Sequence, residues 1–262
     1  MSNKSTEIFT KIPKTGYEEA ALEINSSEFV KVVESRRSVR VFTDERIPDE
    51  VVKKCLELSL LAPSSSNLQP WEFYWVKQPQ TKKEIVRACL SQPAARTADT
   101  LIVCVARTKT WKENSKMMLE FFDNARKEGQ SVPDSAIAYY KKLVPIAYTQ
   151  GPLNILGYVK RVIVFFKGLS SPTPREPVSK AQMITWATKS CALACQNLML
   201  SFRAFGYDTC PMEGYDSSIL RKVLDLSSDA YPVMVIGAGK RAKEGVYGPQ
   251  VRFDSSLFIK EV

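Results

Sequence analysis

Hydrophobic residues recur at helical spacing in several segments of the chain. In residues 27–37, Phe29, Val30 and Val33 share one side of a predicted helix, and Ser26 or Ser27 is suited to cap its start. A longer pattern over 179–205 predicts a helix that ends at a glycine. Its apolar stripe is broad enough to face a core or a partner chain and contains Met183, Ala187, Cys191, Ala194, Cys195, Leu198, Met199 and Phe202.

Proline and acidic residues mark the start of another helix. Pro48 suits a first helical turn because its φ angle is fixed, and Asp49 and Glu50 complement the helix dipole. Helices from Pro79 to about Leu90 and over 216–224 are also predicted. The helix after Pro48 should reach Leu61 and direct inward Val51, Val52, Cys55, Leu58 and Leu61.

Three short apolar runs have the length of buried strands. Residues 71–76 are rich in aromatic side chains, and 100–105 and 231–237 are continuous apolar stretches. A further short strand is expected around 207–210. These runs predict a sheet flanked by helices, and the length and 44% hydrophobic content of the chain fit one domain over 1–262.

Composition narrows the class of protein. The polar N-terminus lacks the apolar stretch of a secretory signal, which predicts a cytoplasmic protein. The six cysteines are too sparse for a disulfide scaffold, and a chain without histidine gives a zinc site poor support, so no metal is expected. The net charge of +9 raises the possibility of nucleic-acid binding, but the basic residues are scattered in pairs that are typical of a solvated surface.

Residues 151–169 are apolar with basic interruptions. Lys160 and Arg161 divide the run, which is too short to cross a bilayer, so no stable membrane insertion is expected. A membrane-surface helix is one interpretation. An insertion that packs over the active site or a dimer edge is the favoured one.

Three segments carry candidate chemistry. Arg36, Arg37, Ser38 and Arg40 could bind a phosphate ester, because charge-assisted hydrogen bonds contribute about 1.5–3 kcal/mol each, although a basic helix end is the simpler interpretation of this segment alone. The Ser- and Asn-rich turn over 63–67 could hydrogen-bond a polar ligand or simply connect a helix to a strand. The third segment, Pro211-Met212-Glu213-Gly214, has a glycine that allows the backbone to approach a flat ring.

These segments and their order resemble the FMN-dependent nitroreductase family. The resemblance is carried by Arg-x-Ser at 36–38, by Pro-Ser-Ser-x-Asn-x-Gln-Pro-Trp within 63–71, by 211–214 and by a C-terminal basic element at 249–252. It implies an α+β fold, a three-layer sandwich with a mixed central sheet flanked by helices. It also implies an intertwined homodimer with FMN at the interface, a variable insertion at about 107–178 and a C-terminal arm at about 255–262.

The resemblance also implies a site. The backbone amides of Glu213 and Gly214 would face the flavin N5, and Arg40 would stabilise negative charge on the reduced ring. Ser64, Ser65 and Asn67 would reach the flavin from the other subunit. The implied cofactor-binding residues are Arg36, Arg37, Ser38, Arg40, Pro63, Ser64, Ser65, Asn67, Gln69, Gln92, Pro211, Met212, Glu213, Gly214, Gln250 and Arg252.

Two positions carry alternatives. Gln250 replaces the family's lysine, so the phosphate would depend on Arg36 and Arg252, or Lys240 or Arg241 would contribute. Ser91 competes with Gln92 for the pyrimidine edge of the flavin.

The implied activity is ping-pong hydride transfer from NADH or NADPH to a small electron-poor acceptor such as a nitroaromatic or a quinone. Reductive dehalogenation and flavin fragmentation are alternatives on the same fold, and a nucleic-acid-binding protein is the least favoured one. A Rossmann dehydrogenase is disfavoured because 237–239 lacks the later glycine and lies near the C-terminus.

Overall fold

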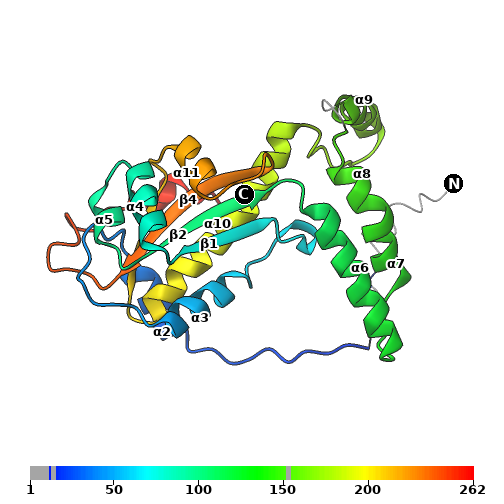
Figure 1. Cartoon of the computed structure of the whole chain (residues 1–262). Helices are drawn as coiled ribbons and strands as arrows, with labels where there is room; N and C mark the ends of the chain where they lie inside the picture. The colour runs from blue at the N-terminus through cyan, green and yellow to red at the C-terminus, as the bar shows by residue number, and fades with distance from the viewer. Residues whose placement is uncertain (1–11, 13–15, 152–154) are drawn as a thin grey trace.

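The computed structural model describes residues 12, 16–151 and 155–262, and a four-stranded sheet forms its centre (Figure 1). The strand order is β1-β2-β4-β3, and neighbouring strands pair antiparallel. Within the described ranges, the parallel component of the predicted mixed sheet is one bridge between Ser38 and Thr209. The bounds are β1 Trp71–Val76, β2 Thr100–Arg107, β3 Asp208–Met212 and β4 Ala230–Gly239.

Prolines in the sheet lie where a missing backbone N–H is tolerated. Pro211 is in β3, an edge strand. Pro232 lies opposite Val105, where the register of β2 and β4 shifts. The strand predicted around 207–210 is β3, which continues through Pro211 and Met212 of the third candidate segment.

Helices cover both faces of the sheet, so the fold has the three layers that the resemblance implied. Alternate side chains of β2 point into two separate cores: Ile102 and Cys104 belong to one core, and Leu101 and Val103 to the other. On the first face lie α3 (Asp49–Ser59) and α10 (Lys180–Ala204), and on the second α4 (Pro79–Ala88), α5 (Pro93–Thr97) and α11 (Ser217–Val223).

The longest helix, α10, forms as its sequence predicts. Ser179 Oγ accepts a hydrogen bond from Gln182 N at 3.2 Å, and Gly206 adopts a φ of 83° just beyond the helix. All eight residues of the predicted stripe are buried in this one chain. The stripe therefore faces the protein's own core and not a partner.

Other helix expectations need correction. The helix α2 spans Ser26–Ser35, and its cap is Asn25, whose side chain accepts from Ser27 N at 3.1 Å. The apolar side of α2 is exposed. The helix α3 stops at Ser59, which leaves Leu61 exposed, and Ala62 is buried in its place.

A helical group stands beyond one end of the sheet (Figure 1). It comprises α6 (Trp111–Lys127), α7 (Asp134–Ala138), the π-helix η2 (Tyr139–Leu143), α8 (Val144–Tyr148) and α9 (Ile155–Ser170). It falls within the predicted variable insertion. Among the described residues, no helix has the length and apolar character needed to span a membrane.

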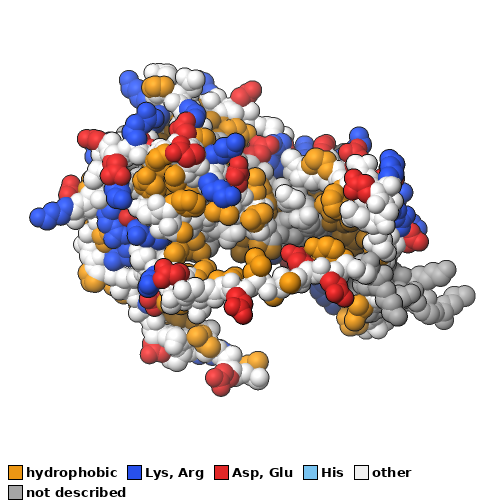
Figure 2. Space-filling model, turned by 90° about the horizontal axis from the view of Figure 1, so that it is seen from below, with side chains coloured by type: hydrophobic (Ala, Val, Ile, Leu, Met, Phe, Trp, Pro, Cys, Tyr) orange, Lys and Arg blue, Asp and Glu red, His pale blue; other side chains and the backbone are white. Residues whose placement is uncertain are grey.

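Two segments lie outside the compact part of the fold. Residues 16–25 run as an exposed chain from the helical group to α2 and cross the lower face of the molecule (Figures 1 and 2). Residues 247–262 are exposed throughout and contain a short turn of helix, η4 (Ser255–Leu257). Both arms carry exposed apolar side chains.

The buried cysteines support a prediction about thiol chemistry. All six are free and buried, and burial raises the pKa of Cys55 to about 12 and that of Cys89 to about 11. At pH 8 only about one Cys55 thiol in ten thousand would be ionised. The pKa of Cys195 is lowered by hydrogen bonds with Cys104 and Cys191, but this thiol, like the other five, is fully buried. Because no thiol is exposed, we expect iodoacetamide to leave the native protein unlabelled by mass spectrometry, whereas the urea-unfolded chain, as the control, should be labelled. Rapid labelling of Cys55 in the native protein would contradict this.

Candidate functional site

The first predicted segment forms a pocket rich in arginine between the end of α2 and the start of β3. Backbone hydrogen bonds fix it, because Val39 N donates to Thr209 O at 3.0 Å and Arg40 N donates to Gly245 O at 2.6 Å. The pocket has a volume of about 310 Å³. Its lining is Arg36, Arg37, Ser38, Arg40 and residues 246–252, including Gln250 and Arg252.

This arginine pocket has a surplus of positive charge. Among the described residues, no ion pair joins any of its four arginines to a carboxylate. Burial lowers the pKa of Arg36, and the charges of Arg252 and Arg37 lower it further. A bound dianion would relieve this repulsion and receive charge-assisted hydrogen bonds, so the donor set fits a phosphate ester.

Gln250 supports the pocket indirectly. In the amide orientation that satisfies both of its polar atoms, Gln250 donates to Glu34 O at 3.2 Å and accepts from Arg252 Nη2 at 3.1 Å. It therefore holds Arg252 in place and adds no charge of its own.

Neither of the two basic residues considered as substitutes lines the pocket. Arg241 Nη2 lies 2.6 Å from the buried carboxylate of Asp208, which also binds Arg203. Lys240 Nζ is directed to Gly206 O at 3.5 Å. In this structure, therefore, neither Lys240 nor Arg241 takes the place of the family's lysine in the lining of the pocket.

The third segment lies along the same sheet edge as the arginine pocket. Pro211 and Met212 end β3, and Glu213 and Gly214 follow as exposed residues. Thr209 is bridged to Ser38 of the pocket. The stretch of chain from Thr209 to Gly214 spans at most about 17 Å. One extended ligand could thus contact both places.

Gln92 joins this third segment from the start of α5. Its Nε2 donates to Gly214 O at 2.8 Å. The competing Ser91 has a φ of 53° in the preceding turn, and no hydrogen bond of its side chain to the segment is observed among the described residues. The structure therefore favours Gln92 at this position.

The second segment is a tight turn with three residues in the left-handed region. Ser66, Asn67 and Gln69 have φ angles of 58°, 48° and 44°. Such conformations cost on the order of 1–3 kcal/mol each and persist only where the surroundings hold them. Ser64 contributes by accepting from Gln69 N at 3.0 Å, and Gln69 Nε2 donates to Asn67 Oδ1 at 3.4 Å.

Tyrosines of the helical group hold this turn. The Tyr148 hydroxyl lies 3.1 Å from Ser65 Oγ, and the Tyr139 hydroxyl lies 2.6 Å from Ser66 Oγ. Tyr140 donates to Ser66 O at 2.7 Å. These tyrosines are more than 70 residues from the turn in sequence, so local pattern analysis had no signal for them.

The turn and the arginine pocket lie at opposite ends of the sheet. The turn leads into Trp71, which pairs with Ala106, and Ala106 pairs with Tyr231 at the start of β4. The pocket adjoins Asp208, which pairs with Gly239 at the other end of β4. One chain therefore does not bring Ser64, Ser65 and Asn67 to the remaining predicted residues.

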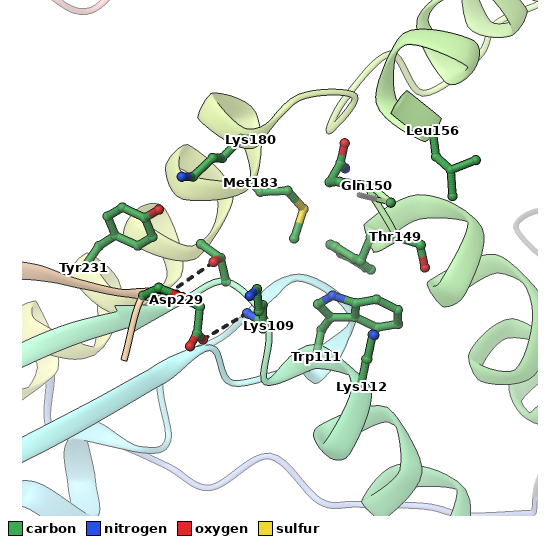
Figure 3. A pocket seen from close by; sticks show the side chains of 14 residues that line it. Lys109, Trp111, Lys112, Thr149, Gln150, Leu156, Lys180, Met183, Asp229 and Tyr231 are labelled. Carbon is green, nitrogen blue, oxygen red and sulfur yellow. Dashed lines mark hydrogen bonds between the residues drawn. The ribbon is translucent and has the colours of Figure 1, made fainter. Parts of the chain in front are cut away.

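Two cavities lie near the turn. The smaller, of about 430 Å³, is lined by Ser64, Ser65, Tyr148 and Trp186, whose buried Nε1 has no hydrogen-bond partner among the described residues. The larger, of about 820 Å³, has aromatic walls and lysines around it (Figure 3). Its lining includes Lys109, Trp111, Lys112, Lys180, Met183 and Tyr231.

A buried ion pair supports the larger cavity. Asp229 binds Arg107 Nε at 3.1 Å and accepts from Lys109 N at 3.3 Å. Burial opposes ionisation of Asp229, but its hydrogen bonds to Arg107 and Ser227 lower its pKa overall. Sequence analysis did not identify either cavity. In the part of the chain that the structure describes, no group of three acidic, Cys or His side chains is arranged to hold a metal ion.

Comparisons with known proteins give the class to which this fold and site belong. The model of the nitroreductase family matches residues 33–240, so the chain belongs to the nitroreductase family. YdgI of Bacillus subtilis (strain 168), named as an NAD(P)H nitroreductase, is 27% identical over 238 residues, which cover 88% of this chain and 97% of YdgI.

Solved structures share the fold. The nitroreductase ydfN of Bacillus subtilis has a TM-score of 0.71 at 20% identity and covers 91% of this chain and 100% of its own. A protein from Exiguobacterium sibiricum 255-15, solved in complex with FMN, has a TM-score of 0.64 at 23% identity and covers 95% and 100%.

Proposed function

We propose that this chain is an FMN-dependent oxidoreductase that transfers hydride from NADH or NADPH to a small electron-poor acceptor such as a nitroaromatic or a quinone. The observation that carries the proposal is the arginine pocket, whose arginines pair with no carboxylate in the described part of the chain and which an edge strand joins to the turn at 211–214. The name of YdgI, an NAD(P)H nitroreductase, supports a nicotinamide as the reductant. The FMN bound to the Exiguobacterium protein supports FMN as the cofactor.

The residues of the chain would bind and orient the cofactor. Arg36, Arg37, Ser38 and Arg252 would hold its phosphate, with Gln250 positioning Arg252. Backbone amides at 213 and 214, beside Gln92, would face the reactive edge of the ring. Arg40 would stabilise negative charge on the reduced ring. When bound, FMN supplies the hydride chemistry in alternating half-reactions with the nicotinamide and the acceptor.

We further propose that the site is completed in a homodimer. The turn at 63–67 lies at the far end of the sheet from the arginine pocket, so a two-fold axis could bring the turn of one subunit to the pocket of the other. The exposed arms 16–25 and 247–262 carry apolar side chains that a partner would cover. The smaller cavity, beside Ser64 and Ser65, would then receive the acceptor, and its volume of about 430 Å³ suits a small ring.

The experiment that tests the activity is an absorbance spectrum of the purified protein, followed by chromatography of the released cofactor. We expect a flavin spectrum and about one FMN per subunit. Turnover with NADH and with NADPH should then be measured against a nitroaromatic, a quinone and a halogenated phenol. Release of FAD, or failure of FMN to bind after reconstitution, would contradict the proposal.

Gln250 provides a prediction with a gain of function. Gln250→Lys restores a cation beside Arg252, and one added charge-assisted contact should tighten FMN binding by about tenfold. Fluorescence titration of the apoprotein measures the change. Gln250→Ala is the matched control and should weaken binding, because Arg252 loses its acceptor. Binding by the lysine variant as weak as that by Gln250→Ala, which lacks the same acceptor, would show that a cation at position 250 does not reach the phosphate.

A further inference from the structure

The helix α9 exposes an unusually large apolar surface. Nine of its side chains are 44–71% exposed: Ile155, Leu156, Tyr158, Val159, Val162, Ile163, Phe165, Phe166 and Leu169. At about 100° per residue, these nine positions fill one continuous half of the helix circumference. Figure 1 places α9 at the outer end of the helical group, away from the sheet.

The opposite half of α9 makes the contacts with the rest of the chain. Gly157 is buried there, and Lys160 Nζ donates to Ala147 O at 3.0 Å and to Thr149 O. Near the end of the helix, Arg175 Nη2 donates to Gly168 O at 3.3 Å. This helix therefore packs through small and polar groups and turns its apolar side outward, which reverses the usual arrangement of a surface helix.

The charge along the segment that contains α9 is of one sign. Between Asp134 and Glu176 the sequence contains no acidic residue and six basic ones: Lys141, Lys142, Lys160, Arg161, Lys167 and Arg175. On the helix circumference, Arg161 and Lys167 flank the apolar half on its two sides. A second copy of this surface would bring like charges together, whereas an anionic lipid surface complements them.

From these observations we propose that α9 docks the protein on an anionic phospholipid surface. The helix lies in the plane of the membrane with its apolar half at the boundary of headgroups and acyl chains. Its 16 residues are about 24 Å long, which suits a helix that lies on a bilayer and not one that crosses it. The lysine-flanked cavity of Figure 3, to which Leu156 contributes, lies beside this surface. The docking is independent of the proposed redox activity.

The test is cosedimentation of the full chain with vesicles. Wild-type protein should bind vesicles of equimolar phosphatidylcholine and phosphatidylglycerol, bind much less to phosphatidylcholine alone and dissociate as salt is raised. Phe166→Asp should lower the partition coefficient by about ten- to a hundredfold, because it removes a phenyl group from the lipid contact. Phe121→Asp, which changes an equally exposed phenylalanine on α6, is the matched control and should bind as wild type does.

Further variants test the contribution of the cations that flank α9 and the insertion of its apolar half into the lipid. Arg161→Glu with Lys167→Glu should weaken binding by at least about fivefold per cation, and Lys83→Glu with Lys243→Glu is the control of equal net charge away from α9. The tryptophan of Phe166→Trp should shift its emission to the blue on adding anionic vesicles, and that of Phe121→Trp should not. Circular dichroism checks that each variant is folded.

Three outcomes would overturn the proposal. One is the absence of vesicle binding by the wild type. Another is equal binding by the Phe166→Asp and Phe121→Asp variants. The third is a smaller oligomer for Phe166→Asp in sedimentation velocity without any dependence on vesicles, which would show that a second copy of the chain covers α9.

Discussion

Arg36→Ala is expected to weaken FMN binding by about ten- to a hundredfold while the protein stays folded. Loss of one charge-assisted contact costs on the order of 1.5–3 kcal/mol. Burial lowers the pKa of Arg36, and repulsion by Arg252 and Arg37 lowers it further, so truncation removes an unfavourably placed charge and the apoprotein should not lose stability. Fluorescence titration of apoprotein with FMN measures the affinity, and thermal unfolding measures the stability.

Two variants sharpen this result. Arg96→Ala removes an exposed arginine of α5 that does not line the arginine pocket, and it should bind FMN as wild type does. Arg36→Lys keeps the charge but loses the planar pair of donors, so its affinity should fall between wild type and Arg36→Ala. If Arg36→Ala and wild type bind FMN with equal affinity, Arg36 does not contact the phosphate and is only a basic residue at the end of α2.

Two variants with complementary defects are expected to regain activity when their subunits pair in a mixed dimer. A chain with Arg36→Ala has a damaged arginine pocket, and a chain with Ser64→Ala, Ser65→Ala and Asn67→Ala has a damaged turn. In a mixed dimer, one site combines both defects, and the other combines an intact pocket with an intact turn. Coexpression with random pairing should therefore recover about a quarter of the wild-type activity from two parents of low activity.

Two affinity tags allow the mixed dimer to be isolated, and its FMN content and turnover can be measured directly. Each parent carrying both tags serves as the control for handling. If the isolated mixed dimer shows only the mean activity of its parents, the pocket and turn of one site come from the same chain. A monomer that retains FMN in sedimentation velocity would lead to the same conclusion.

Those parts of the fold with strong local signals were predictable from sequence. The helix α10 has a serine cap, a terminal glycine and a regular apolar stripe, and β1 and β2 are runs of apolar or aromatic residues. In contrast, α2 has helical periodicity but leaves Phe29 and Val33 exposed. Periodicity predicts that a helix forms, but it does not say what covers its apolar side.

The candidate site was predictable in part for a similar reason. Each of the segments at 36–40, 63–69 and 211–214 is continuous in sequence, and Arg36 and Arg252 do line one pocket. The roles of Gln250 and Arg241 could not be predicted, because each depends on a partner distant in sequence. The tyrosines that hold Ser65 and Ser66 depend on the placement of an entire helical group.

Those tyrosines make the conformation of the serine turn depend on the helical group. Tyr139, Tyr140 and Tyr148 belong to the segment expected to vary most in the family, yet they hold a turn whose backbone is strained without them. A chimera that exchanges the helical group but keeps residues 63–69 would therefore separate the turn from its hydroxyl partners. Diversification of the acceptor pocket, in evolution or in the laboratory, would have to exchange both segments together.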